Sequence, residues 1–224
     1  DDGEADVLTI NVDAPTDPAG YEQWEIRILD PKGNRFYLYN GRGRPPRRLT
    51  WDGYSADGEL VQAASEYTIE GIFVDELRNS RTVREILPID VLVIKEGDQY
   101  KIRISSINFA PNTAEFTGIS PEQDQKNEQT LDRLSEILQK YDEYRIRVEG
   151  HANNVTGTQR EEEEELKPLS EARAEAIKQA LVKRGIRAAR METVGKGGTE
   201  PVVPRSDREN WWKNRRVEFI LIRE

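Results

Sequence analysis

The chain of 224 residues contains no cysteine, one histidine and one methionine. Because it has no thiol, disulfide bonds, thiolate metal ligands and cysteine nucleophiles are all excluded. His151 is the only histidine, which disfavours a multi-histidine metal centre or a Ser-His-Asp triad. No apolar run approaches the roughly 18 residues that can span a bilayer, so we expect no transmembrane segment. We expect neither a metal nor a cofactor.

Charged residues, in contrast, make up 33% of the chain, hydrophobic residues make up 36%, and the mean hydropathy is -0.79. Four Trp, eight Tyr and five Phe are enough to anchor folded cores. The net charge of -9 comes from residues 1–100, with 20 acidic and 11 basic side chains, whereas residues 101–224 hold 22 of each. Such a surface repels or ignores a phosphate backbone, so we expect no nucleic-acid partner.

Apolar and polar residues alternate through the first hundred residues. Trp24, Ile26 and Ile28 share one face of a segment whose other face carries Glu25 and Arg27, which is the period of a β-strand. Turns rich in Asp, Gly and Pro separate such segments, and no helical period is sustained. The sequence therefore predicts an all-β sandwich.

The apolar segment 86–94 is interpreted as the strand that leaves this first domain. It stops at a polar Lys-Glu-Gly-Asp sequence, which places the boundary near residue 97 and divides the chain into domains 1–97 and 98–224. The chain opens at Asp1 with no Met and no signal-like segment, so we expect it to be a mature or trimmed part of a longer precursor.

Part of the first domain resembles a known module. The run Trp24–Ile28, the turn Trp51-Asp52-Gly53 and the later Tyr67 and Val74-Asp75 are similar to the immunoglobulin-like module of the flagellar hook-capping protein family. The resemblance covers about 60 residues and implies a spacer or docking domain. It does not identify a ligand, because a fold by itself does not define a function.

Two features of this domain have a functional and a structural interpretation. Four arginines crowd a Gly/Pro-rich loop and could bind an anionic partner or form a solvated hairpin loop: Arg42, Arg44, Arg47 and Arg48. Asp52 and Asp57 could ligate calcium or act as turn formers that accept hydrogen bonds from nearby backbone N–H groups.

The second half of the chain alternates between strand and helix patterns. Amphipathic helical spacing covers residues 124–141, and a second apolar stripe begins near Leu169, with Ser170 as its expected N-cap. Strand patterns cover residues 100–109, 144–150, 191–194 and 217–221. This β-α-β-α-β order predicts an α+β domain with helices on one face of a mixed sheet.

Three separated blocks in this half resemble the OmpA-like domain family. Residues 148–154 read Val-Glu-Gly-His-Ala-Asn-Asn where the family carries a strand ending in Gly-His-Thr-Asp-Asn. Residues 169–174 match its Leu-Ser-x-x-Arg-Ala helix start, and residues 214–219 match its Asn-Arg-Arg-Val-Glu closing strand. Phe109–Asn112 fits the opening strand, and the match spans about residues 101–222.

The resemblance implies noncovalent binding of peptidoglycan. In the family, the Asp of Thr-Asp-Asn accepts a hydrogen bond from the ammonium of the stem diamino acid, and the Arg of Leu-Ser-x-x-Arg grips a stem carboxylate. Here Arg173 and Asn154 are retained, whereas Asn153 replaces the Asp and Ala152 replaces the Thr. Together with Arg215, these are the candidate binding residues, and Leu166 replaces a further family Asn.

Structural roles are open for the same side chains. Asn153 and Asn154 could simply hold their loop, Arg173 could pair with a loop glutamate, and either Arg215 or Arg216 could be structural. His151 is expected to be a strand-end residue bonded to a loop.

Two neighbouring segments bear on the same site. The run Glu161–Glu165 is expected to be a solvated, mobile insertion. It could also repel the stem carboxylate, favour a more cationic stem peptide, or close the site as a folded-over loop. Of Trp211 and Trp212, one is expected in the core, although the pair could stack on sugar rings.

We therefore expect a noncatalytic cell-envelope protein that binds the peptidoglycan stem peptide weakly or with altered specificity. The alternative is a structural adaptor whose degenerate site has lost peptidoglycan and binds a protein partner. A hydrolase is disfavoured because no paired catalytic carboxylates stand in a recognised context. The resemblance places the protein in the periplasm, tethered to the outer membrane through a missing N-terminal segment.

Overall fold

The computed structural model describes residues 7–14, 20–91, 93–96, 99–104 and 107–223. The chain divides into two compact units, one made of Asp1–Val61 with Ser65–Ile89 and the other of Gln62–Ala64 with Asp90–Glu224. The boundary predicted near residue 97 lies outside the described residues. Each unit is described by itself.

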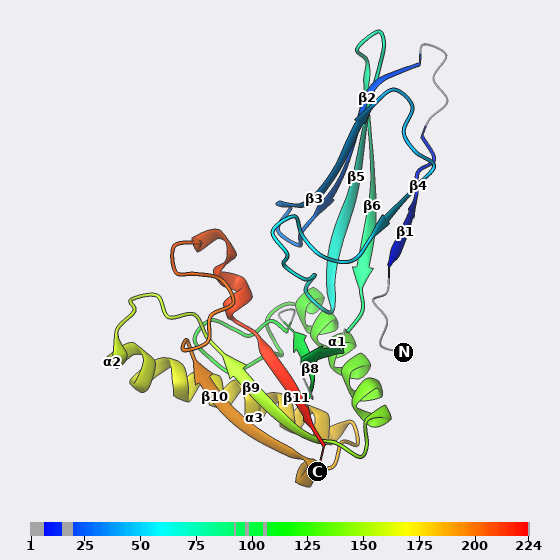
Figure 1. Cartoon of the computed structure of the whole chain (residues 1–224). Coiled ribbons are helices and arrows are strands. Elements are labelled where there is room, and N and C mark those ends of the chain that lie inside the picture. The colour runs from blue at the N-terminus through cyan, green and yellow to red at the C-terminus, as the bar shows by residue number, and fades with distance from the viewer. Residues whose placement is uncertain (1–6, 15–19, 92, 97–98, 105–106, 224) are drawn as a thin grey trace. The chain divides into compact units, whose positions relative to one another are not determined.

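The first unit consists of β-sheets, as the alternating pattern predicts (Figure 1). An antiparallel sheet in the order β3-β2-β5-β6 is built from Arg35–Arg42, Tyr21–Leu29, Ser65–Asp75 and Ser80–Ile89. A two-stranded sheet pairs β1 (Leu8–Asn11) with β4 (Arg48–Trp51). The inward side chains of Trp24 and Phe73 are buried together, and Leu49 packs against them. The immunoglobulin-like character of this unit stays a prediction.

The single strand predicted over residues 86–94 is wrong. Strand β6 ends at Ile89, and the short strand β7 (Ile94–Glu96) belongs to the sheet of the second unit. Asp90 interrupts the pattern because its carboxylate accepts a 2.6 Å hydrogen bond from Arg133 and a 2.7 Å bond from the backbone N–H of Val91.

The second unit is a mixed five-stranded sheet covered by helices, as predicted at this level (Figure 1). Its order is β10-β9-β11-β8-β7, where β8 is Gln99–Ile104, β9 is Arg145–His151, β10 is Met191–Gly197 and β11 is Val217–Ile222. Strands β9 and β10 are parallel and the other pairs are antiparallel. Val148 and Phe219, fully buried, pack with Leu134 of α1 (Pro121–Lys140) and Ile177 of α3 (Lys167–Lys183).

Local sequence explains where α1 begins. The Ser120 side chain accepts a 3.2 Å hydrogen bond from the backbone N–H of Gln123, and Pro121 stands in the first turn, where its missing N–H is no loss.

The opening strand expected to reach Phe109 and Asn112 is wrong at its end, because β8 stops at Ile104 and residues 107–112 contain no strand.

Helix α3 begins earlier than its sequence predicts, and Ser170 is not its N-cap. A short helix α2 (Gln159–Glu161), capped by Thr158, runs through a π-helical turn (Glu162–Leu166) directly into α3. Ser170 is instead buried inside the helix, and its hydroxyl accepts a 2.9 Å hydrogen bond from the backbone N–H of Gly197.

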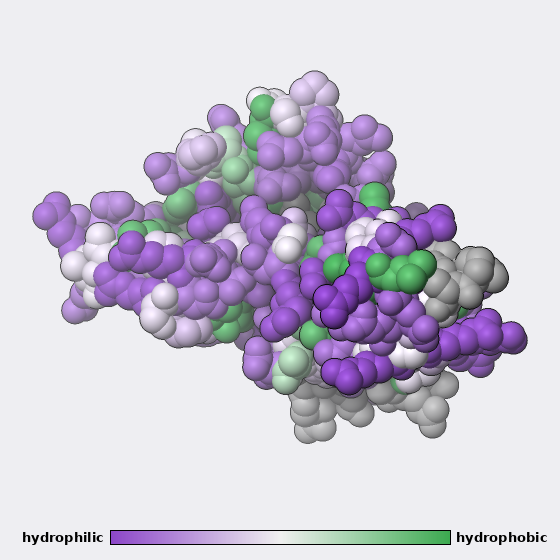
Figure 2. Space-filling view, turned by 90° about the horizontal axis from the view of Figure 1, so that it is seen from above, coloured by the Kyte–Doolittle hydropathy of each residue, from purple (hydrophilic) through white to green (hydrophobic). Residues whose placement is uncertain are grey.

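None of the described helices is long and apolar enough to cross a membrane. On the face drawn in Figure 2, apolar side chains form small separate groups among hydrophilic ones, in keeping with the high content of charged residues.

Helix α3 approaches the sheet so closely that glycine is required beneath it. A Cβ atom at residue 150 of β9 would overlap the backbone carbonyl oxygen of Ser170. We expect Gly150→Ala to destabilise the second unit by about 1–3 kcal/mol, because helix and strand must separate. The measurement is the free energy of opening from hydrogen exchange of β9 amides.

Gly118→Ala is the matched control, because residue 118 has a φ of 74° and nothing within 4 Å of the added Cβ atom. It should cost about 1 kcal/mol from backbone strain alone. Equal effects of the two substitutions would contradict the close-packing argument.

Candidate functional site

Two loops meet at one end of the central strands β9 and β11. Val217, the first residue of β11, pairs with Gly150 of β9, so the segments 152–154 and 214–216 lie next to each other. The amide of Asn214 donates a buried 2.8 Å hydrogen bond to Oδ1 of Asn153. This bond ties the two candidate segments together and uses the acceptor of Asn153.

Asn214 also organises the loop in front of it. Its Oδ1 accepts hydrogen bonds from the backbone N–H groups of Val202 and Val203, at 2.9 and 3.0 Å. Ala152 is buried and donates its backbone N–H to the carbonyl of Gly197 at 2.7 Å. The methyl group of Ala152 therefore fills space and adds no polar group to the site.

Arg173 lies on α3 with only 8% of its surface exposed. Its Nε donates a 3.0 Å hydrogen bond to the carbonyl of Thr113, and its guanidinium stacks 4.8 Å from the centre of the Phe109 ring. Within the described residues no carboxylate lies at ion-pair distance, so the predicted alternative of an Arg173–glutamate pair is wrong. Burial, and then the charge of Arg215, lowers the pKa of Arg173.

Arg215 is exposed, whereas Arg216 is buried, so the prediction that one of the two is structural is confirmed. Because Arg215 and Arg173 repel each other, the two guanidiniums create a local excess of positive charge. An anion placed between them would relieve both the repulsion and the burial of an unpaired cation.

The glutamate run is anchored at its start, so the predicted solvated, mobile insertion is wrong for its first two residues. The Glu162 carboxylate accepts hydrogen bonds from the amide of Asn154 at 3.1 Å and from the backbone N–H of Gly198 at 2.9 Å. Glu161 accepts a 2.8 Å bond from the backbone N–H of Thr156. The side chains of Glu163, Glu164 and Glu165 are exposed.

Asn154 is consequently satisfied inside the protein. Besides its bond to Glu162, its Oδ1 accepts a 2.5 Å hydrogen bond from the backbone N–H of Gly157. The interpretation that it holds its own loop is thus confirmed.

The sheet face opposite the helices carries a charge network that sequence reasoning missed. Glu218 of β11 is 1% exposed and lies 2.6 Å from Nε of Arg216 and 2.7 Å from Nε of Arg103. Burial opposes ionisation of this carboxyl, but the two guanidiniums outweigh it and hold the pKa of Glu218 well below its usual range. The alternation of apolar and polar residues along the strands predicts that one face of the sheet is polar. Which charged side chains lie next to each other on that face depends on the register between strands, which the sequence does not give.

His151, at the end of β9, belongs to this network. It is 2% exposed, and neither ring nitrogen has a hydrogen-bond partner in the described part of the chain, so the expected bond to a loop is wrong. Burial, and then the charge of Arg216, lowers the pKa of His151 to about 4. The imidazole is therefore neutral at pH 7.

His151, Glu149 and Glu200 each place one potential metal-ligand atom within 4.8 Å of the others. However, the Lys196 ammonium already lies 2.9 Å from the Glu200 carboxylate and 3.6 Å from that of Glu149. Both carboxylates of this group are thus already paired with the chain's own cation, and we assign no metal here.

Trp211 and Trp212 lie in the 3₁₀ helix Arg208–Asn214, and both are half-buried. Neither contributes to the hydrophobic core of the second unit, so the expectation of one core tryptophan is wrong. Arg208 lies over the Trp211 ring and Lys213 over the Trp212 ring, each 5.6 Å from the centre.

The family model described as the OmpA family matches residues 108–215, and these residues form an OmpA family domain.

The chain is similar to the peptidoglycan-associated lipoprotein of Rhizobium meliloti (strain 1021), with 39% identity over 92 residues that cover 41% of this chain and 49% of the relative. It is also similar to the probable lipoprotein YiaD of Escherichia coli (strain K12), with 28% identity over 131 residues, 58% of this chain and 55% of the relative. The chain thus spans about half the length of the curated relatives it matches.

Among solved structures, the cell wall anchor of the T6SS from Pseudomonas aeruginosa matches with 28% identity and a TM-score of 0.47, covering 60% of this chain and 88% of that chain.

The buried neutral histidine makes stability depend on pH. The pKa of His151 is about 4 in the folded protein, whereas its ordinary value, which applies to the unfolded chain, is 6.5. As the pH falls, the unfolded chain therefore binds a proton at His151 before the folded protein does. We expect the second unit to lose about 2 kcal/mol between pH 6.5 and about pH 5. Hydrogen exchange of β9 and β11 amides, corrected for the intrinsic rate, measures this loss.

His151→Gln cannot titrate and should flatten the dependence in the same window. Glu200 and Glu218 have lowered pKa values and stay ionised there. An unchanged pH slope in the variant would assign the effect to another group.

Proposed function

We propose that the OmpA family domain is a noncatalytic cell-envelope module that holds the stem peptide of peptidoglycan through Arg173. The observation that carries the proposal is the buried guanidinium of Arg173, which stacks on Phe109, has no carboxylate at ion-pair distance in the described residues and stands near the like charge of Arg215. A planar guanidinium binds a carboxylate through two parallel hydrogen bonds, which suits a stem carboxylate.

The ammonium-recognising half of this site has changed. Asn153 offers a neutral acceptor where the family has a carboxylate, and Asn214 already donates a hydrogen bond to that acceptor. Charge-assisted hydrogen bonds contribute about 1.5–3 kcal/mol, so their loss weakens binding of an ammonium by about ten- to a hundredfold. We therefore propose weak binding, or selectivity for a stem whose carboxylate dominates recognition.

Localisation follows from the same proposal. The relatives are named peptidoglycan-associated lipoprotein and probable lipoprotein, which supports a place in the cell envelope. We propose that this place is the periplasm, with attachment to the outer membrane. The charged-residue balance of residues 101–224 is neutral, so this domain does not repel an anionic ligand as a whole.

A structural adaptor is the second candidate, and a specific observation favours it. Asn154 is fully engaged by Glu162 and Gly157, and the acceptor of Asn153 is engaged by Asn214. These bonds satisfy both polar atoms of the Asn154 side chain and Oδ1 of Asn153 without a ligand, whereas Nδ2 of Asn153 has no partner in the described part of the chain. In this alternative the domain keeps the fold and binds a protein partner.

Sacculus co-sedimentation of the intact chain tests the proposal. Arg173→Ala should weaken binding by about ten- to a hundredfold, because it removes the charge-assisted contact to the carboxylate. Arg187→Ala is the matched control, because Arg187 is an exposed arginine of the same unit, and it should bind like the parent. Equal binding by the parent and Arg173→Ala would exclude this pocket, and no binding by any form would favour the adaptor.

Asn153→Asp tests the ammonium-recognising half. The restored carboxylate should strengthen sacculus binding by up to about tenfold, because it can accept a charge-assisted hydrogen bond from the stem ammonium and still accept the bond from Asn214. The effect should disappear at high salt. Unchanged affinity would show that the neutral residue is not what limits binding.

A further inference from the structure

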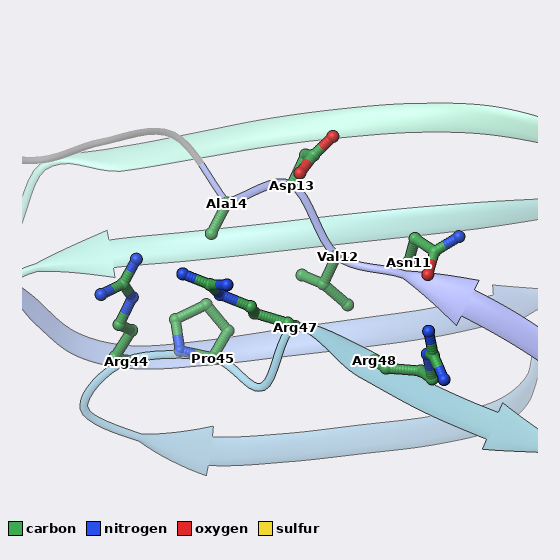
Figure 3. A pocket seen from close by; sticks show the side chains of 8 residues that line it. All are labelled: Asn11, Val12, Asp13, Ala14, Arg44, Pro45, Arg47 and Arg48. Carbon is green, nitrogen blue, oxygen red and sulfur yellow. The ribbon is translucent and has the colours of Figure 1, made fainter.

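The first unit contains a cavity of about 820 Å³ that the proposed function leaves unused. It lies between residues 11–14, which follow β1, and residues 44–48, which lead into β4 (Figure 3). Its volume is that of a small-molecule site.

Three arginines provide the charge of this pocket: Arg44, Arg47 and Arg48. Figure 3 shows the guanidinium ends of Arg44 and Arg47 next to each other and the Asp13 carboxylate turned away from them. In the described part of the chain, no carboxylate lies at ion-pair distance from any of the three. Like charges without a counter-ion are unfavourable, and a bound anion relieves that repulsion.

The backbone that carries these arginines is held in place on both sides. The backbone N–H of Val12 donates a 3.0 Å hydrogen bond to the carbonyl of Arg47, and that of Gly43 donates a 3.1 Å bond to the carbonyl of Glu22. Pro45 is buried and has a fixed φ angle. The backbone of the pocket would therefore need little ordering when a ligand binds.

The surroundings make this pocket a local exception in charge. Residues 1–100 carry 20 acidic and 11 basic side chains, and three of those bases line one cavity, Arg44 and Arg47 at one end of it and Arg48 beside Asn11 (Figure 3). The rest of the lining is formed by the polar side chains of Asn11 and Asp13 and by the small apolar side chains of Val12, Ala14 and Pro45, which can contact the nonpolar body of a ligand.

We propose that this pocket binds a phosphate monoester carried on a small polar molecule, such as a sugar phosphate or the headgroup of a glycolipid. Three arginines and Asp13 line the pocket, so its formal net charge of +2 (three minus one) exceeds the charge of one carboxylate. A phosphate monoester carries a charge between about -1.5 and -2 at pH 7 and presents three acceptor oxygens. Guanidinium forks bind such oxygens in pairs. The cavity is large enough for the sugar as well as the phosphate.

Isothermal titration calorimetry of the full chain with glucose 1-phosphate tests the proposal, with glucose and citrate as comparison probes. The double variant Arg44→Ala/Arg47→Ala should bind at least tenfold more weakly than the parent. Arg35→Ala/Arg81→Ala is the matched control, because both residues are exposed arginines of the same unit and the charge change is equal. It should bind within twofold of the parent.

Titrations repeated in Arg173→Ala separate this site from the anion site of the second unit. No saturable binding at millimolar glucose 1-phosphate, equal losses in the two double variants, or equally tight binding of citrate would each overturn the proposal. Because Arg173 is absent in these titrations, their failure leaves the peptidoglycan proposal untouched.

Vesicle flotation identifies the source of the phosphate. Phosphatidylcholine vesicles with and without phosphatidic acid distinguish a lipid headgroup from a soluble ligand. Flotation that needs phosphatidic acid and is lost in Arg44→Ala/Arg47→Ala supports the lipid source. Calorimetric binding without flotation supports the soluble source.

Discussion

The close packing of α3 on β9 is the constraint on which the candidate site depends. Only a glycine at position 150 lets the backbone of the strand lie against the carbonyl of Ser170, and the hydroxyl of Ser170 then reaches the backbone N–H of Gly197. Arg173 stands three residues after Ser170, almost one turn further along the helix. The position of Arg173 relative to the loop after β9 is therefore fixed by the contacts of Gly150 and Gly197 with Ser170. Such contacts to the backbone vary less in geometry than contacts between long side chains.

Buried charge is handled in opposite ways on the two faces of the sheet. Glu218 is surrounded by Arg216, Arg103 and Lys101, so its carboxylate is compensated within the chain. Arg173 has a ring and one carbonyl but no counter-ion in the described residues. Removing one partner of a buried pair is costly because it leaves an uncompensated charge. Among the described residues, the buried guanidinium of Arg173 thus lacks the internal counter-ion that the carboxylate of Glu218 has, and this contrast is what the proposed role of Arg173 rests on.

Much of this arrangement follows from the sequence, because periodicity and local motifs act over short distances. The alternation around Trp24 and Ile26 predicts strand β2, and the apolar spacing around Leu134 predicts α1. The N-cap assigned to Ser170 failed because a preceding π-helical turn extends the helix, and nothing local distinguishes that turn from a solvated run of glutamates. The network around Glu218 depends on which residues face each other across β8, β9 and β11, and a single sequence does not specify that register.

The glutamate run is accommodated ahead of α3 without disturbing the packing of that helix. The π-helical turn absorbs Glu162–Leu166 ahead of α3, so the helix and Arg173 keep their place against β9. Glu162 then uses its carboxylate to hold both Asn154 and the backbone N–H of Gly198. The amide of Asn154 is thereby hydrogen-bonded to Glu162 inside the chain, whereas the guanidinium of Arg173 has no carboxylate partner among the described residues. Under the proposed function, the described bonds therefore leave Arg173, and not the amide of Asn154, without a charged partner in the described part of the chain.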